Sequence, residues 1–249
     1  MQADRPPQVG GATAAGASMC NLFSMTSNKD AIRNMFGVVV DNTGNMPPQP
    51  GIYPNYSAPI VRNTAAGREL AMLMWGMPTP PEHQPKSGRD EAQTNIRNLH
   101  VPFWQQFLGV ENRCLVPWTS FAEPERLPDG KAQNVWFAMD ETRSLMCFPG
   151  IYVDGWTSIR KVKDGPTTNN LFGFLTTKPN ADIKPYHPKA MPVVFRTREE
   201  CDAWMSLPIK EARMLQKTLP DGILRIVARG TPTDGGEAEA LATRPGQLL

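Results

Sequence analysis

The sequence has no long hydrophobic run, and cysteine is scarce in it. Nothing in its 249 residues approaches the roughly 18 consecutive apolar residues that a membrane-spanning helix requires, so we expect no contact with a membrane. The four cysteines lie far apart and form no C-x-x-C pair: Cys20, Cys114, Cys147 and Cys201. This spacing argues against a zinc site and, without a secretion signal, against a disulfide framework. We therefore expect no metal or other cofactor, and a reducing cytoplasm as the location.

The chain also lacks an excess of charge of either sign. It has 26 Lys and Arg against 24 Asp and Glu, a net charge of +2. This balance neither favours nor excludes nucleic acid, because binding needs a local basic groove. Proline, in contrast, is abundant at 25 residues, roughly twice the average usage. So much proline argues against long helices and for short strands joined by fixed turns.

Signals for secondary structure are short and follow one another closely. Four helices are expected, at residues 28–37, at 102–108, in a segment opened by the capping box 197–200, and at 208–219. Strands are expected at residues 58–63, 69–75, 114–117, 135–139, 145–153, 171–177, 192–196 and 223–228. Many strands with few helices between them predict an α+β domain, with mainly antiparallel strands forming a barrel-like or two-sheet core.

The two ends of the chain differ in composition from the middle. Residues 1–18 are rich in small residues, Pro and Gly, and have no apolar signal-peptide core, so we expect a disordered leader. Residues 19–229 contain neither a repeat nor a linker and predict a single domain. Residues 230–249 are polar and rich in Gly and Pro, which predicts a second disordered tail.

Cys20 is the residue whose position carries the most chemistry. It follows Met19, so a start at Met19, or removal of the leader, would leave it at the N-terminus with a free α-amine and a thiol. The two groups titrate near pH ~8 and ~8.5. An aldehyde would form an imine with the amine, and the sulfur would then close a five-membered thiazolidine ring, a closure that is fast because it is intramolecular. The alternative is a small buried hydrophobic residue, the common fate of cysteine.

Three further segments carry polar groups that suit such a reaction. Asn95 and Arg97 share one side of an extended segment, where an amide and a guanidinium suit a sugar oxygen and a phosphate. Glu123 lies between apolar residues, so burial would raise its pKa toward acid–base duty. His187 lies in a proline-clamped loop that gives the imidazole a rigid support. The alternatives are that Asn95 and Arg97 belong to a solvated polar face, that Glu123 is an exposed loop glutamate, and that His187 has a structural role.

Taken in order, these segments resemble the SOS-response-associated peptidase (SRAP) family, whose members process abasic sites. The resemblance covers residues 19 to about 229. It rests on the order and spacing of Met19-Cys20, Met74-Trp-Gly76, Thr94-Asn-Ile-Arg97, Arg113-Cys-Leu-Val-Pro117 with Glu123, Gly173-Phe-Leu-Thr-Thr177, and His187 before Met191-Pro-Val193.

The resemblance implies a covalent thiazolidine crosslink between an N-terminal cysteine and an abasic site in single-stranded DNA. Cys20 would be the nucleophile, Asn95 would orient the sugar, Glu123 would shuttle protons, and His187 would be a second acid–base partner. It also implies possible autoproteolytic exposure of the cysteine. The expected partner is single-stranded DNA with abasic sites, bound by a monomer at the nucleoid.

DNA contacts are expected from one aromatic and several basic side chains. Trp75 would stack on bases beside the lesion. Arg97 would hold a flanking phosphate, and the basic groove would include Arg62, Arg160, Lys161 and Lys163. The alternative is that these cations form ordinary solvated surface.

The sequence departs from the family pattern at three places. Cys20 is followed by Asn21 and Leu22 instead of Gly-Arg, Glu123 lies in Phe-Ala-Glu-Pro instead of Phe-Tyr-Glu-Trp, and one extra residue separates His187 from the Met-Pro pair. With the leader attached, the nitrogen of Cys20 is an amide that cannot form an imine. Three interpretations follow: translation starts at Met19, the leader is cleaved, or this member does not crosslink. We favour the first.

Two other functions fit the same residues. One is an N-terminal-nucleophile cysteine amidohydrolase or peptidase, in which the thiol attacks an amide carbonyl and the α-amine acts as the base. The other is a single-stranded DNA binder without covalent chemistry, whose affinity would fall steeply with salt.

Overall fold

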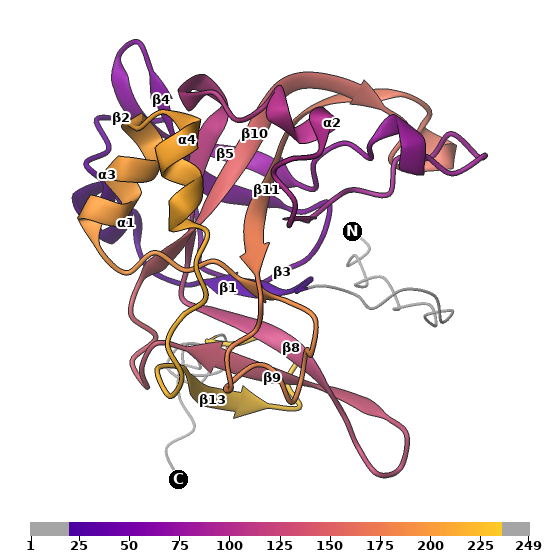
Figure 1. Cartoon of the computed structure of the whole chain (residues 1–249), viewed down its shortest axis with the longest axis vertical. Coiled ribbons are helices and arrows are strands. Elements are labelled where there is room, and N and C mark those ends of the chain that lie inside the picture. The colour runs from indigo at the N-terminus through magenta and orange to yellow at the C-terminus, as the bar shows by residue number, and fades with distance from the viewer. Residues whose placement is uncertain (1–19, 236–249) are drawn as a thin grey trace, which may run out of the picture.

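The described residues of the computed structural model, 20–235, are built mostly of strands (Figure 1). The strands are β1 (Phe23–Met25), β2 (Val40–Asp41), β3 (Gln49–Ile52), β4 (Ser57–Thr64), β5 (Gly67–Trp75), β6 (Asn95–Ile96), β7 (Arg113–Trp118), β8 (Ser120–Arg126), β9 (Ala132–Ala138), β10 (Met146–Ser158), β11 (Thr167–Thr177), β12 (Met191–Pro192) and β13 (Arg225–Arg229). The α-helices are α1 (Lys29–Phe36), α2 (Pro102–Gln105), α3 (Arg198–Ser206) and α4 (Ile209–Ala212), and the 3₁₀ helices are η1 (Pro81–His83), η2 (Val110–Asn112), η3 (Val162–Asp164) and η4 (Arg213–Leu215). The predicted fold class is confirmed.

A barrel forms in the upper half of Figure 1 because the first and last strands of a curved sheet pair with each other. In the order β5, β4, β7, β10, β11, each strand is antiparallel to the next. A parallel pairing of β11 with β5 closes the ring, with Leu171 opposite Met74 and Phe172 opposite Trp75. Closure leaves these strands without an exposed edge.

A second, antiparallel sheet lies below the barrel, with the strand order β13, β9, β8, β1, β3. β1 is an inner strand, paired with β8 on one side and the edge strand β3 on the other, and Phe23 of β1 lies opposite Phe121 of β8. The Phe23 ring also contacts two barrel rings, Trp75 at 4.9 Å and Phe174 at 6.1 Å between centroids. The start of the described chain is therefore held between the sheet and the barrel.

Two helices begin where the sequence predicts them. In α1, the side chain of Asn28 accepts a hydrogen bond from the Ala31 amide, and Gly37 ends the helix in the left-handed conformation at φ 65°. In α3, Thr197 and Glu200 form the predicted capping box. Within residues 20–235, no helix is both long and apolar enough to cross a bilayer.

Three predicted elements are shorter than expected. α2 ends at Gln105 because the next turns form i→i−3 hydrogen bonds, such as that from the Phe107 amide to Trp104. The helix predicted at 208–219 changes to the 3₁₀ helix η4 after Ala212. The strand predicted at 192–196 ends at Pro192, because the Val193 amide bonds to β11 whereas the Phe195 amide bonds to Cys147 of β10.

Several strands were not expected from the sequence. β1, β2, β3 and β8 were not predicted. β1 and β2 are two or three residues long, and β3 contains Pro50 and Gly51, so none of them carries a recognisable alternation of polar and apolar residues.

The ordered part of the chain extends past the predicted boundary at residue 229. Asp234 is buried, and its carboxylate accepts hydrogen bonds from Ser120 at 2.5 Å and from the Arg143 guanidinium at 2.7 Å. Residues 230–235 are therefore part of the domain, and not of a disordered tail as expected. The rest of that tail, and the predicted leader, lie outside the described residues.

Candidate active site

Cys20 lies next to β8, three residues before β1. The pairing of β1 with β8 continues toward Cys20, because the Ala122 amide donates to the carbonyl oxygen of Leu22 at 2.9 Å. The Cys20 Sγ lies 3.7 Å from the Leu22 oxygen and 3.8 Å from the Ala122 oxygen. The residue is only 3% exposed, and burial, followed by the negative charge of Glu123, raises the pKa of its thiol. The thiol is thus held neutral in a buried position.

Glu123 is the acidic neighbour of this thiol. It lies on β8 opposite Val135 of β9 and is 1% exposed. Burial raises the pKa of its carboxyl to about 8, and the Cys20 thiol lowers it to a smaller extent. Among the described residues, neither carboxyl oxygen has a partner at good hydrogen-bond geometry. A carboxyl with this pKa holds its proton at neutral pH and can both donate and take up a proton there.

Asn95 ties the barrel to the segment that carries Cys20. It lies on β6, opposite Phe174 of β11 in a parallel pairing. Its amide nitrogen donates to the carbonyl oxygen of Cys20 at 3.0 Å and to the Thr94 hydroxyl at 2.8 Å. The Thr94 hydroxyl in turn donates to the Asn21 side chain at 3.0 Å. These contacts fix the backbone at Cys20 against β6 and leave the Asn95 side-chain oxygen buried with no partner in residues 20–235.

His187 lies in the loop between β11 and β12. Its Nδ1 is 2.7 Å from the carbonyl oxygen of Ala190 and 3.0 Å from the Ala190 amide nitrogen, so the loop fixes the ring. Its Nε2 is buried and has no partner in the described part of the chain. The preceding residue, Tyr186, packs its ring 5.2 Å from Phe137, which stacks on Phe121 of β8. This packing places the loop that carries His187 against β9, the neighbour of β8.

Thr176 is a further member of this group that the sequence reasoning missed. It is 1% exposed, and its hydroxyl is buried without a partner in the described chain. Alternation along β11 places it on the same face as Phe174, whose ring contacts Phe23. A polar residue two positions after an inward-facing aromatic is the signal that could have found it. Unpaired buried polar atoms are rare in folded proteins, and Asn95, Glu123, Thr176 and His187 each carry at least one among the described residues.

Trp75 does not have the position that base stacking needs. Its side chain is fully buried, its ring stacks on Phe174 at 5.3 Å, and its Nε1 donates to the Thr94 oxygen. Both faces of the ring are used within the core, so the expectation that it contacts DNA bases does not agree with the structure.

Two predicted basic contacts are also occupied by acidic partners. Arg160 is buried, lies 3.4 Å from the Asp90 carboxylate and donates to the Gly76 oxygen. Arg62 forms ion pairs with Glu69 at 2.6 Å and Asp154 at 2.8 Å. Their charges are compensated within the fold, so neither fits the expected basic groove.

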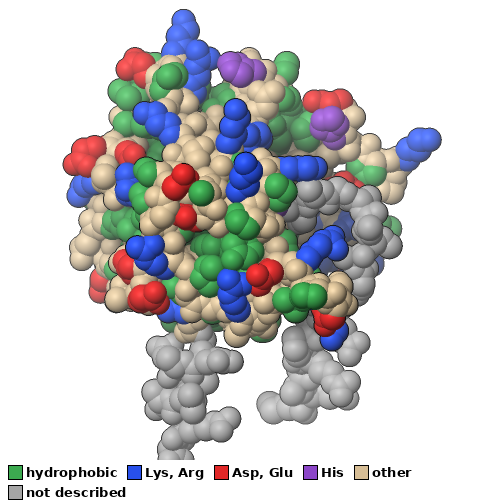
Figure 2. Space-filling view, turned by 60° about the horizontal axis from the view of Figure 1, so that its bottom comes forward, with side chains coloured by type: hydrophobic (Ala, Val, Ile, Leu, Met, Phe, Trp, Pro, Cys, Tyr) green, Lys and Arg blue, Asp and Glu red, His purple; other side chains and the backbone are tan. Residues whose placement is uncertain are grey.

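Arg97 and the two lysines remain available. Arg97 is half-buried, and its Nη1 donates to the backbone oxygens of Thr177 and Lys189. Lys161 and Lys163 are exposed at η3. On the face shown in Figure 2, Lys and Arg side chains are spread over much of the surface, with Asp and Glu side chains among them.

The described residues offer no cluster of three or more His, Cys, Asp or Glu that could hold a metal ion. The groups that lie at Cys20 are its thiol, the Glu123 carboxyl with its raised pKa, and the Asn95 side-chain amide. This set suits nucleophilic attack on a carbonyl carbon with proton transfer by Glu123.

Sequence comparisons match the chain to a protein family and to related proteins. The model of the family described as SOS response associated peptidase (SRAP) matches residues 19–226. Abasic site processing protein YoqW of Bacillus subtilis (strain 168) is 27% identical over 207 residues, which are 81% of this chain and 86% of that protein. Abasic site processing protein YoaM of the same organism is 25% identical over 190 residues, which are 76% and 79% of the two chains.

Solved structures share the fold. A crystal structure of a protein from Bordetella bronchiseptica has a TM-score of 0.62 at 18% identity, covering 85% of this chain and 98% of that one. A crystal structure of a protein from Bacteroides thetaiotaomicron has a TM-score of 0.63 at 21% identity, covering 83% and 90% of the two chains.

Proposed function

Because this chain belongs to the SOS response associated peptidase (SRAP) family, we propose that it processes abasic sites in single-stranded DNA through a covalent bond to Cys20. The observation that carries the proposal is the buried contact between the Cys20 thiol and Glu123, whose pKa is raised to about 8. An ordinary core cysteine has no uncompensated carboxyl beside it. The names of the relatives YoqW and YoaM supply the substrate.

The proposed reaction has two steps. The α-amine of Cys20 adds to the aldehyde of the ring-opened sugar and releases water to give an imine. The Cys20 sulfur then adds to the carbon of this imine, which still carries a proton on its nitrogen, its own proton passes to the Glu123 carboxylate, and a thiazolidine ring closes. Protonated Glu123 donates to the departing oxygen, and the resulting carboxylate takes up the thiol proton, because a pKa of about 8 allows both at neutral pH.

The remaining residues position the two reactants. Asn95 holds the Cys20 carbonyl, and its unpaired oxygen accepts from a sugar hydroxyl. His187 presents its unpaired Nε2 as a second proton donor or acceptor. Arg97 and Lys161 contact phosphates. The buried setting of Cys20 suits a sugar that has lost its base better than an intact nucleotide.

The proposal requires a free amine on Cys20, so the test compares two forms of the protein. One is expressed from Met19 with the methionine removed, and the other carries residues 1–18. Each is incubated with a uracil-glycosylase-treated single strand and run on a denaturing gel, with intact mass measured beforehand. We expect an adduct only from the form with N-terminal Cys20, and none from Cys20→Ala. Absence of an adduct from a protein shown by mass to begin at Cys20 would refute the proposal.

A cysteine peptidase is the second candidate, favoured by the description of the family. The same thiol would attack the peptide bond before Cys20, with Glu123 as proton shuttle. Release of the leader from the full-length chain, lost in both Cys20→Ala and Glu123→Gln, would support this activity. It is compatible with crosslinking, since such cleavage frees the amine.

A further inference from the structure

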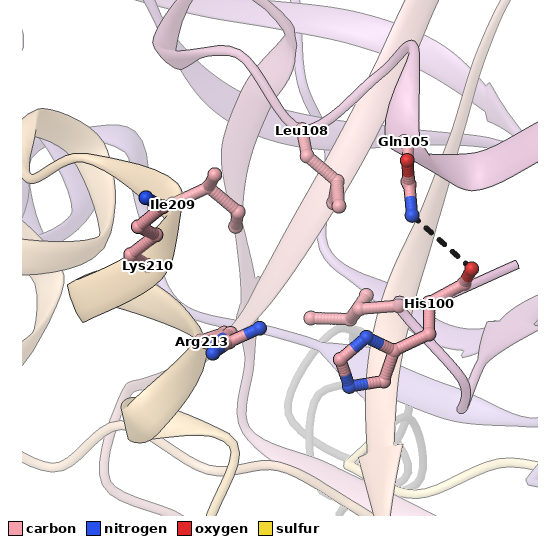
Figure 3. Close-up of a pocket in the computed structure, with 7 residues that line it drawn as sticks. His100, Gln105, Leu108, Ile209, Lys210 and Arg213 are labelled. Carbon is pink, nitrogen blue, oxygen red and sulfur yellow. Dashed lines mark hydrogen bonds between the residues drawn. The ribbon is translucent and has the colours of Figure 1, made fainter. Parts of the chain in front are cut away.

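A groove lies between the segment that follows β6 and the end of the helical region formed by α4 and η4. It consists of two cavities of about 340 and 250 Å³ that share Leu99, His100 and Arg213. Figure 3 shows Lys210 and Arg213 on one side and His100 and Gln105 on the other, with the Gln105 side chain bonded to the His100 oxygen at 3.2 Å. We call it the Arg213 groove.

The groove is positively charged. Its basic lining residues are Arg97, His100, Lys210 and Arg213, and none of its lining residues is acidic. Lys210 and Arg213 are exposed, and neither forms an ion pair within residues 20–235, in contrast to Arg62 and Arg160. Uncompensated cations that line a concave surface attract an anionic ligand.

Two short connections join the groove to the segments that carry the Cys20 site. Arg97, at one end, is two residues from Asn95, about 7 Å along an extended segment. Gln216, another lining residue, donates from its side chain to the backbone oxygens of Arg97 and Thr176, each at 2.8 Å. The wall of the groove is therefore bonded directly to the segments that carry Asn95 and Thr176, two of the four residues with unpaired polar groups.

The groove also has apolar surface. Met214 lines it and is 64% exposed, although most methionines of the chain are buried or partly buried, and Leu99 lies beside it. Cations next to an exposed apolar side chain match a nucleotide, in which a phosphate adjoins a flat apolar base.

We propose that the Arg213 groove binds the strand on one side of the abasic site, with Lys210 and Arg213 at phosphates and Met214 against a base. This inference rests on the proposed function for the identity of the strand. It assigns to residues 209–214, far along the chain from Cys20, the role of fixing the direction in which DNA leaves the site.

The test uses non-covalent binding, which does not depend on the crosslink. Two labelled oligonucleotides each carry a tetrahydrofuran abasic analogue, one at the 5′ end and one at the 3′ end, so that nucleotides extend to one side only. Binding is measured by fluorescence anisotropy at several salt concentrations for wild type and for Lys210→Gln/Arg213→Gln. The control is Lys86→Gln/Lys131→Gln, which removes the same charge at exposed positions outside the groove.

We expect the groove variant to bind one of the two oligonucleotides 5- to 10-fold more weakly and the other within 2-fold of wild type. The slope of log K against log salt should fall by about 0.7 for each cation removed, because each releases its counterions from a single strand. Met214→Ser should weaken the same oligonucleotide without changing the slope.

Unchanged binding, or equal weakening of both oligonucleotides, would overturn the inference. A groove variant that behaves like the Lys86/Lys131 control would do the same. Failure of the proposed function is separate from these results, because it is read from the absence of a wild-type adduct on a true abasic strand.

Discussion

The side-chain amide of Asn95 donates a 3.0 Å hydrogen bond to the backbone carbonyl of Cys20, which lies 75 positions earlier in the chain. The bond joins β6, which pairs with the barrel strand β11, to the segment that leads into the second sheet. Two parts of the fold therefore meet at the proposed nucleophile, and the orientation of Cys20 depends on this contact.

The first prediction concerns this contact. Asn95→Ala removes the donor, and we expect the rate of crosslinking to an abasic single strand to fall on the order of 10- to 100-fold, as small misplacements of reacting groups do. Quantification of adduct against time on denaturing gels measures the effect. Asn45→Ala, at an exposed position in the loop before β3 and outside the Arg213 groove, should react at the wild-type rate. A wild-type rate in Asn95→Ala would show that Cys20 is positioned by other contacts.

The second prediction concerns Glu123 and pH. Its pKa is raised from 4.5 to about 8 by burial, so between these values the unfolded chain releases a proton that the folded chain keeps. Wild-type stability should therefore fall as pH rises through this window. The Glu123→Gln variant does not lose stability in this way. Its free energy of unfolding, compared with that of wild type, should therefore increase by up to about 4 kcal/mol between pH 4.5 and 8.5.

Urea denaturation across this pH range measures the difference. Glu125→Gln is the matched control on the same strand, because hydrogen bonds from Gln133 and then Arg229 lower the pKa of Glu125. That variant should gain no stability as pH rises. A constant difference between Glu123→Gln and wild type at all pH values would contradict the raised pKa of Glu123.

The third prediction concerns Arg113, a buried cation on β7. Its Nε donates to the Leu108 oxygen at 2.8 Å, and its Nη1 donates to the oxygens of Trp204 and Leu207 near the end of α3. Arg113→Met leaves these carbonyls without a donor, so we expect a loss of about 3 kcal/mol or more. Thermal unfolding should occur roughly 6–12 °C lower. Arg126→Met, at an exposed position, should change the midpoint of thermal unfolding little. Equal midpoints for the two variants would contradict the prediction, because they would mean that water replaces the hydrogen bonds of the Arg113 guanidinium.

The fourth prediction concerns Asp234. Its buried carboxylate pairs with Arg143 and Ser120, so Asp234→Ala leaves a partly buried guanidinium unpaired. We expect a loss of about 2–3 kcal/mol, measured by urea denaturation. Asp164→Ala, at the exposed η3, should stay within about 0.5 kcal/mol of wild type. An unchanged Asp234→Ala would show that the domain ends before residue 230 in energetic terms.

The sequence predicts local structure best where local chemistry determines it. The ends of α1 and the start of α3 depend on Asn28, Gly37 and the Thr197–Glu200 box, which act within one turn of the helix. The parallel pairing of β5 with β11 joins segments almost one hundred residues apart, and no local pattern encodes it. The same holds for β1, which is too short to be recognised until β8 and β3 lie beside it.

The candidate site shows the same division. Residue type and order point to Cys20, Asn95, Glu123 and His187. The structure brings Cys20 into contact with Asn95 and Glu123. The DNA contacts were harder to predict, because the availability of a side chain depends on distant partners. Asp90 neutralises Arg160, and Phe174 covers Trp75, and neither partner is close in sequence.

The position of β1 between β8 and β3 has a consequence for the N-terminus that the proposed chemistry needs. Ends of chains usually fray, and a frayed amine would have to be immobilised each time it met an aldehyde. Here β8 and β3 hold β1 on both sides only three residues after Cys20. The entropy of ordering that end is lost once, when the protein folds, so each encounter with a lesion begins with the amine and the sulfur already preorganised.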